Sequence, residues 1–303
     1  MNALPRRPVL APGLAVLVRA PGELQIGRSD RHRLVVADSP AVRRTLAVLG
    51  RGETPPGDDE TRQVLDELAP VLRDGDALVR PGLPPAEVAA IALRHPASAE
   101  DRLGSRRSAR IWVLGDWSPD PSLLLASSGL ASSGLASSGL ASDSGPTKGA
   151  TVALVLCHGD LDRHTSDALV RSRVPHLLLR AVESEIILGP FVGPGATACL
   201  RCLDAHQSDE DPSYRAPTPA AVRYDGVPAP CDSALGTVAL GWAVGDLVRY
   251  VEGDLPTTWS ATVTFTPGQT SVDAVPWSRH PACGCSWADE PAWRKDPSVM
   301  MGA

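Results

Sequence analysis

The sequence predicts two domains of different class: a small α+β domain of the winged-helix type, followed by an α/β domain on an open, largely parallel sheet. Three observations lead to this prediction. Three short strand-like runs precede three helical segments within residues 1–100. Strands then alternate with helices from residue 109 onward, and two close pairs of cysteines stand far apart in this second part. At 303 residues the chain can bury more than one core.

In the first domain, residues 1–100, the apolar runs predict strands at 14–19, 23–27 and 33–37 and helices at 39–49, 59–73 and 84–94. Residues 81–108 then hold the last helix and a linker. A winged helix often binds DNA, but here the third helix has only Arg94 and His95 as basic groups, and Glu87 would repel phosphate. The pattern therefore argues against a DNA-reading helix.

The second domain, residues 109–303, begins with an apolar strand at 111–114. Further strands are expected at 152–157, 176–181 and 184–188, with a helix at 162–173 between them. Residues 234–250 are apolar around much of the helix circumference, which predicts a largely buried helix. Alternating residues at 258–265 and 270–275 predict a closing hairpin.

An Ala-Ser-Ser-Gly-Leu repeat occupies residues 126–144 of this domain. Serine and glycine favour a flexible stretch, whereas the leucine at every fifth position would allow a helix to continue. We expect the repeat to be flexible.

The turn after the first strand of an α/β sheet is where a nucleotide's phosphates usually bind, because glycines expose backbone amides there. In this chain the turn is Gly115-Asp116-Trp117-Ser118-Pro119-Asp120-Pro121. The two acids repel phosphate, the indole crowds the loop, and each proline removes an amide donor. We therefore expect no ATP at this turn.

The cysteines form two tight pairs, Cys199-x-x-Cys202 and Cys283-x-Cys285. Four thiolates brought together make the tetrahedral site that zinc prefers, and a site with four protein ligands is structural because no position is open to water. The alternative is four buried free cysteines. Cys157 and Cys231 have no partner at metal-ligand spacing; Cys157 closes an apolar strand, and Cys231 lies in a polar loop where it could be reactive.

Net charge and hydropathy exclude several classes. A formal charge of −6 argues against a general nucleic-acid binder. Residues 1–12 lack the apolar run of a signal peptide, and no stretch of about eighteen apolar residues predicts a membrane span. Reduced thiols that hold a metal are typical of the cytoplasm, where we expect this protein.

Two stretches carry a resemblance to a known family. The runs 193–203 and 280–285, which contain the cysteine pairs, resemble ThiF-like proteins related to ubiquitin-activating adenylating enzymes. More narrowly, they resemble the ThiF-like cyclodehydratase partners of bacterial thiazole and oxazole peptide and thiopeptide clusters. Residues 13–36, with the run Gly-Glu-Leu-Gln-Ile-Gly at 22–27, are similar to the opening of the leader-peptide recognition domain (RiPP recognition element) of that family.

The resemblance implies that the leader segment of a precursor peptide adds a strand to an exposed sheet edge and packs against the third helix. The edge would comprise Arg33, Leu34, Val35, Val36 and Ala37. The groove would be formed by Val88, Ile91 and Ala92, which can equally be core residues. Arginines near the edge could attract an acidic leader, and a solvated surface explains them as well.

The resemblance further implies a non-catalytic protein that delivers the precursor peptide to a YcaO-type cyclodehydratase, and pairing as a homodimer is one option. Adenylation needs a phosphate-binding turn and an acid for magnesium; of these the chain keeps only a candidate acid, Asp160. His158 and His164 are expected to be structural. The alternatives are an ATP-dependent adenylating enzyme of the ThiF type and a zinc-stabilised transcriptional regulator.

Overall fold

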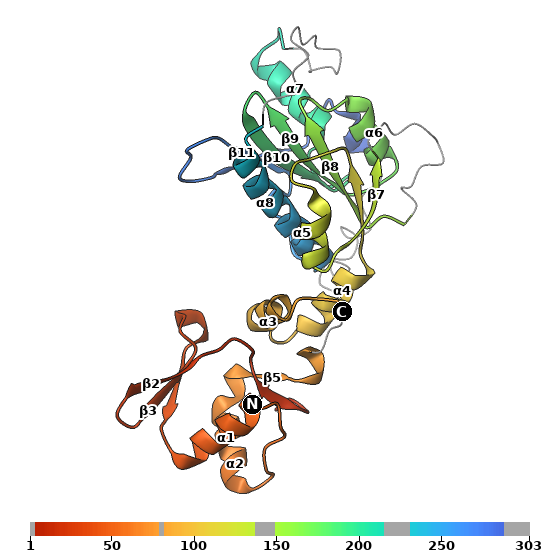
Figure 1. The fold of residues 1–303 in the computed structure, drawn as a ribbon. Coiled ribbons are helices and arrows are strands. Elements are labelled where there is room, and N and C mark those ends of the chain that lie inside the picture. Colours follow the sequence, from red (N-terminus) through yellow and green to blue (C-terminus); the bar gives the residue numbers. More distant parts are fainter. Residues whose placement is uncertain (1–3, 79–81, 137–148, 215–230, 288–303) are drawn as a thin grey trace. The chain divides into compact units, whose positions relative to one another are not determined.

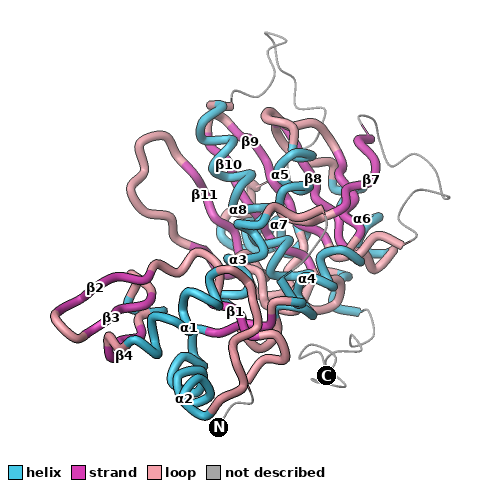
Figure 2. Tube along the Cα trace, turned by 60° about the horizontal axis from the view of Figure 1, so that its bottom comes forward, coloured by secondary structure: helices cyan, strands magenta, loops and turns pink. Residues whose placement is uncertain are grey.

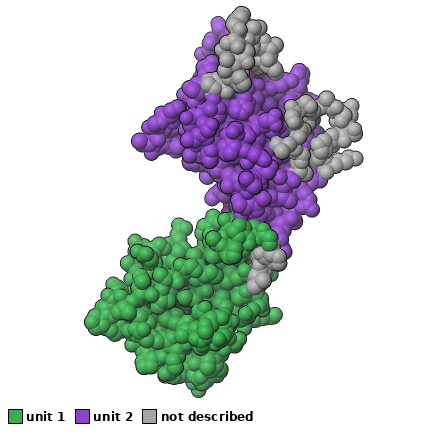
Figure 3. Space-filling view, in the orientation of Figure 1, with its two compact units in different colours: residues 1–104 green, residues 105–303 purple. Residues whose placement is uncertain are grey.

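Buried apolar side chains gather into separate cores in two parts of the chain. The computed structural model describes residues 4–78, 82–136, 149–214 and 231–287, and it divides into unit 1, Met1–Gly104, and unit 2, Ser105–Ala303 (Figure 3). Each unit is described by itself below. In the described residues, no helix is both long enough and apolar enough to cross a bilayer.

The described part of unit 1 contains two small sheets and four α-helices. Figure 2 colours these elements by type. Its strands are β1 (Pro8–Leu10), β2 (Val16–Ala20), β3 (Glu23–Ile26), β4 (Leu34–Ala37) and β5 (Leu72–Asp74). Its helices are α1 (Pro40–Gly50), α2 (Asp59–Leu68), α3 (Pro85–Arg94) and α4 (Ala99–Ser108), the last of which crosses into unit 2. Strands β2, β3 and β4 form an antiparallel meander, and β1 pairs with β5.

Side-chain caps fix where α1 and α2 begin. The Ser39 hydroxyl accepts a hydrogen bond from the backbone N–H of Val42 in α1, and the Asp58 carboxylate accepts one from Thr61 in α2. Helix α2 ends at Leu68 rather than at residue 73 as predicted. Pro70 cannot continue a helix, and residues 72–74 instead pair with β1. The linker expected before residue 108 is helix α4.

Unit 2 contains a seven-stranded sheet in the order β12-β11-β10-β9-β8-β6-β7. Figure 1 labels β11, β10, β9, β8 and β7 of this sheet. Its strands are β6 (Arg110–Leu114), β7 (Ala131–Ala136), β8 (Val152–His158), β9 (His176–Val182), β10 (Glu185–Val192), β11 (Ala261–Phe265) and β12 (Ala274–Pro276). Neighbours β7, β6, β8 and β9 are parallel, whereas the pairs from β9 to β12 are antiparallel. The sheet thus has the predicted parallel part and, from β9 to β12, an antiparallel part. The cause is the two-residue turn Glu183-Ser184, both with positive φ, which makes β9 and β10 a hairpin.

Helices cover both faces of this sheet. Apolar residues of α5 (Pro121–Ser127) and α8 (Ser233–Val251) share one buried cluster with one face, including Leu125 and Leu240. The other face packs against α6 (Arg163–Arg171) and α7 (Leu200–Glu210), through Leu169 and Leu200 among others. The helix predicted to be largely buried is α8, but it buries only one face, and Val238 on its other side is 59% exposed. The three layers position the cysteines on the α7 side.

The Ala-Ser-Ser-Gly-Leu repeat is ordered where the structure describes it. Sequence composition predicts a flexible stretch at 126–144, yet residues 126–127 end α5 and residues 131–136 form the edge strand β7. The reason is tertiary: the backbone of β7 pairs in parallel with β6, so pairing rather than side-chain preference decides the conformation. Residues 137–144 lie outside the described residues.

Candidate functional site

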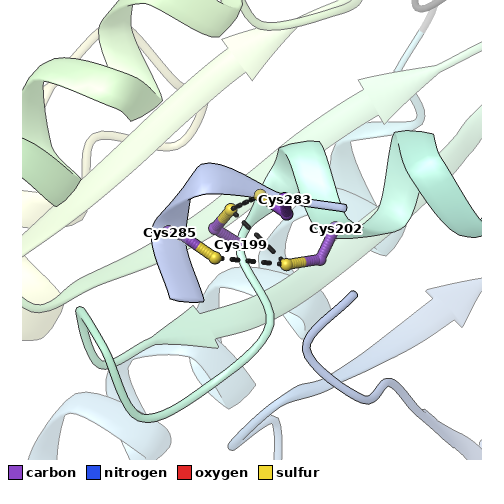
Figure 4. A group of neighbouring side chains, drawn as sticks. All are labelled: Cys199, Cys202, Cys283 and Cys285. Atoms are coloured by element: carbon purple, nitrogen blue, oxygen red, sulfur yellow. Dashed lines mark hydrogen bonds between the residues drawn. The ribbon is translucent and has the colours of Figure 1, made fainter. Parts of the chain in front are cut away.

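The four cysteines of the two pairs form one cluster in unit 2 (Figure 4). Their sulfur atoms all lie within 4.8 Å of one another. The Sγ–Sγ distances are 3.8 Å for Cys199–Cys202, 3.7 Å for Cys199–Cys283 and 3.3 Å for Cys202–Cys285. All four are free thiols, and all but Cys285 are buried. The structure thus brings together the residues that the sequence predicted as ligands.

Backbone and side-chain hydrogen bonds hold the two cysteine-bearing segments. Before Cys199, the Thr197 hydroxyl accepts a hydrogen bond from the Gly193 amide at 2.8 Å. Ahead of Cys283, an Nε2–Oδ2 contact of 2.8 Å joins His280 to Asp209 of α7. Arg279 also donates to the Gly195 carbonyl at 2.8 Å. The C-terminal segment is therefore joined to α7 and to the loop before it by contacts outside the cysteines themselves.

The donor set fits a zinc ion. A tetrahedron of sulfurs with Zn–S bonds of about 2.3 Å has edges of about 3.8 Å, and two of the three measured distances, 3.7 and 3.8 Å, agree with it. Hydrogen bonds from the Cys199 and Cys285 thiols hold the pKa of Cys202 far below its ordinary value. The same contact with Cys202 raises the pKa of Cys199. Without a cation the cluster therefore cannot hold four thiolates, and a dication would supply the missing charge.

The two remaining cysteines lie apart from this cluster. Cys157 ends the apolar stretch of β8, is half-buried and packs against the α6–α7 side core, as the sequence indicated. Cys231 packs against the opposite core, next to the start of α8. Burial raises the pKa of the Cys231 thiol, which disfavours the reactive thiolate.

The turn after β6 is filled by its own side chains. The Trp117 indole is buried, stacks on His158 with ring centroids 5.0 Å apart, and donates to the Gly236 carbonyl of α8. At the start of α5 the Asp120 carboxylate accepts a hydrogen bond from the Ser122 amide. The carboxylate therefore takes a backbone donor that a phosphate would use, and the indole occupies space beyond β6 and β8.

Gly115 lets the turn after β6 pass close to strand β8. It has φ +87°, and a Cβ at this position would lie 2.1 Å from the Leu156 carbonyl oxygen. Glycine is thus required by the close approach of the neighbouring strand β8.

Asp160 and two arginines line a cavity of about 410 Å³ between α7 and the sheet. Arg163 pairs with Asp204 through two hydrogen bonds of 2.8 Å. Arg180, near the end of β9, lines the same cavity. Sequence reasoning missed this site, although a lone arginine within the apolar run 177–182 is a signal that could have found it. Of the two histidines considered above, His158 stacks on Trp117, and His164 lies exposed in the first turn of α6.

In unit 1, strand β4 lies at the edge of its sheet, where among the described residues it pairs only with β3. The Asp38 amide donates to the Gly22 carbonyl just beyond this pairing. Since backbone groups alternate in direction along an antiparallel strand, Leu34 and Val36 bond to β3. The amides of Val35 and Ala37 therefore point to the open edge. Arg33 precedes the strand and pairs with Asp30 at 3.1 Å.

The three residues predicted for the groove are buried in α3. Val88, Ile91 and Ala92 pack with Ala99 and Leu103 of α4 in a cluster of their own. Val36, on the inner face of β4, belongs to a different cluster, which includes α1 and α2. The predicted edge and the predicted groove thus lie in separate apolar clusters of the described unit.

Comparison with known proteins gives matches among solved structures. No family model and no curated protein matches the chain. E. coli MccB in complex with MccA aligns with 93% of this chain and 99% of its own, at 12% identity and a TM-score of 0.59. E. coli MccB with ATP aligns with 92% of this chain and 99% of its own, at 12% identity and a TM-score of 0.56.

The heterocyclase TruD aligns with 92% of this chain but 42% of its own length, at 18% identity and a TM-score of 0.59. A heterocyclase in complex with substrate and cofactor aligns with 92% of this chain and 39% of its own, at 15% identity and a TM-score of 0.59. At such identities the likeness concerns the fold. Over more than nine tenths of its length, this chain therefore has the fold of MccB. It also has the fold of a region that makes up about two fifths of the length of each heterocyclase.

Proposed function

We propose that this protein is a non-catalytic partner in the biosynthesis of ribosomally made, azole-containing peptides. It binds the leader of a precursor peptide and delivers the peptide to a YcaO-type cyclodehydratase. The single observation that carries the proposal is the open edge of β4 in a small N-terminal unit. An extended peptide that adds to this edge would gain main-chain hydrogen bonds from Val35 and Ala37.

The fold similarity supports the same conclusion. The matching structures include MccB with the peptide MccA and heterocyclases that contain a comparable region within longer chains. A separate protein of this fold would act by local concentration: a bound leader keeps the rest of the precursor near the enzyme's active site.

The filled turn after β6 supports the absence of adenylation. Trp117 and Asp120 take the space and a backbone donor that a nucleotide's phosphates would need. In this proposal unit 2 is a docking body, and a structural zinc held by Cys199, Cys202, Cys283 and Cys285 joins its C-terminal segment to α7.

Leader binding is tested by fluorescence polarisation of labelled leader peptides, taken from small precursor genes beside this gene, with the full chain. Val35→Pro removes an edge amide of β4 and leaves the bonds to β3 intact, and we expect at least tenfold weaker binding. Val18→Pro on β2, the other edge strand of the same sheet, is the matched control and should bind as the wild type does. Saturable binding that both variants retain would contradict the proposed edge.

The alternative is an ATP-dependent adenylating enzyme of the ThiF type. It is favoured by the coverage of nearly the whole of MccB, a protein solved with ATP. Exchange of labelled pyrophosphate into ATP separates the two proposals. The partner proposal requires no exchange in the presence of precursor peptide, whereas an adenylating enzyme gives peptide-dependent exchange.

A further inference from the structure

Arg180 is a buried cation without a partner among the described residues. It lies in β9, pairs in register with Cys157 of β8 and Ile187 of β10, and is 8% exposed. No hydrogen bond or ion pair of its guanidinium is formed within the described residues, and its buried Nε has no hydrogen-bond partner. Burial lowers the pKa of Arg180, which is the sign of an environment that disfavours the charge.

The neighbouring Arg163 lines the same cavity, and its guanidinium has hydrogen-bond partners. Arg163 makes two hydrogen bonds of 2.8 Å to the Asp204 carboxylate and one of 2.7 Å to the Leu161 carbonyl. Asp204 also accepts a hydrogen bond from the Tyr214 hydroxyl. Asp204 is therefore committed to other donors. Asp160 and Asp204 favour the charge of Arg180 from a distance, but neither forms an ion pair with it within the described residues.

A buried guanidinium without hydrogen-bond partners destabilises the folded state, because arginine stays protonated and loses its hydration. An anion that binds to such a group replaces the lost hydration and lowers the free-energy cost of its burial. Arginine's planar fork matches the oxygens of a carboxylate or a phosphate.

The cavity beside Arg180 is suited to such an anion. Its volume of about 410 Å³ lies within the range of small-molecule sites. Apolar walls come from Leu200, Leu203, Val275 and Trp277, and the strand side adds the hydroxyls of Thr262 and Thr264. Asp160 also lines the cavity, where its carboxylate favours the charge of Arg180 and repels an anion that comes close to Asp160 itself. The walls thus favour one oxyanion group on an apolar body.

We propose that this cavity is a binding site for a small oxyanion ligand, a carboxylate or phosphate on an apolar body, anchored by Arg180. The site is distinct from the cysteine cluster and from the β4 edge. Anion binding in this cavity depends neither on peptide binding nor on a metal. Its failure and the failure of the proposed function can therefore be distinguished.

The test uses the full chain and isothermal titration calorimetry with benzoate and phenyl phosphate at constant ionic strength. Benzamide is the neutral probe of similar shape. We expect at least one of the two anions to bind the wild type and benzamide not to bind. Preference for benzoate assigns a carboxylate ligand, and preference for phenyl phosphate assigns a phosphate ligand.

Three variants localise the binding. Arg180→Met should weaken anion binding at least tenfold, and Arg180→Lys, which keeps the charge without the fork, should give an intermediate affinity. Arg171→Met, which removes an exposed charge from α6, should bind as the wild type does. Without ligand, the unfolding temperature of Arg180→Met should be at least that of the wild type. The reason is that this variant removes a buried charge that has no ion-pair partner within the described residues.

Several results would overturn the proposal. If neither anion binds the wild type, and Arg180→Met lowers the unfolding temperature, Arg180 is a structural cation. If the anions bind the wild type and Arg180→Met equally, the anion site lies elsewhere. Should Arg180→Met fail to fold, unchanged anion affinity in Arg180→Lys, or equal binding of benzamide and benzoate by the wild type, would overturn it.

Discussion

At the scale of single residues, the cysteine cluster is the feature with the clearest chemical consequence. Each sulfur would supply a quarter of the ligand set, so the loss of one opens the site and weakens it. We expect Cys202→Ser to lower bound zinc from one ion per chain to near zero, measured by mass spectrometry of the metal content. The unfolding temperature should fall as well, because metal-binding energy is folding energy.

Cys231→Ser is the control for this measurement, since Cys231 is a partly buried cysteine outside the cluster. It should keep the full zinc content. A wild-type protein that contains no zinc after expression in zinc-supplemented medium would contradict the assignment.

His176 gives a second prediction at this scale. The ring is fully buried, its Nδ1 contacts the Val174 carbonyl at 2.9 Å, and burial lowers the pKa of His176 to about 4. The unfolded chain takes up a proton near pH 6.5, which the folded chain refuses until about pH 4. Stability is therefore lost as the pH falls from about 6.5 towards 4.

Urea unfolding at pH 7.5 and 5.5 measures this effect. The wild type should lose about 1 kcal/mol more than His176→Leu between the two pH values. Both proteins keep the cysteine cluster, so its own pH dependence cancels in the comparison. Equal losses in the two proteins would show that His176 does not contribute.

At the scale of secondary-structure elements, α8 is held in place by one buried carboxylate. Asp246 accepts four hydrogen bonds, from the backbone amides and the hydroxyls of Thr257 and Thr258. Asp246→Ala would leave these donors unpaired, and we expect the free energy of unfolding to fall by about 3–5 kcal/mol. Asp232→Ala, at the exposed N-cap of the same helix, should cost about 1 kcal/mol. Comparable losses in the two variants, measured by urea unfolding, would contradict this ranking.

At the scale of the whole molecule, the two units have separate cores and separate candidate sites. The β4 edge belongs to unit 1, and the cysteine cluster belongs to unit 2. Removal of metal by a chelator should therefore lower the unfolding temperature of unit 2 and leave leader binding by the full chain within about twofold, because each core is stabilised mainly by its own burial. Loss of leader binding together with the metal, measured by fluorescence polarisation, would show that the units depend on each other.

Several features were predictable because they are local in the sequence. In unit 1, strands β2, β3 and β4 and helices α1 and α3 lie close to their predicted ranges. Side-chain periodicity and caps such as Ser39 fix these elements locally. The cysteine pairs could be grouped because their spacing already matches a metal site. The acid, the indole and the prolines of the turn after β6, on which the expectation of no ATP rests, are likewise local features of the sequence.

Other features were decided by tertiary structure alone, because they depend on partners distant in the sequence. The repeat at 131–136 becomes strand β7 only through pairing with β6, and residues 72–74 leave the predicted helix only because β1 pairs with them. Burial of Val88, Ile91 and Ala92 against α4 depends on helix packing that periodicity does not reveal. Likewise, Arg180 is one arginine in an apolar run until the fold buries it, with no hydrogen-bond partner for its Nε within the described residues, and opens a cavity beside it. The sequence by itself determined the local conformation and the chemistry of the four cysteines that are candidate metal ligands. Long-range packing determined which side chains are buried, which are paired, and which lack a hydrogen-bond partner within the described residues.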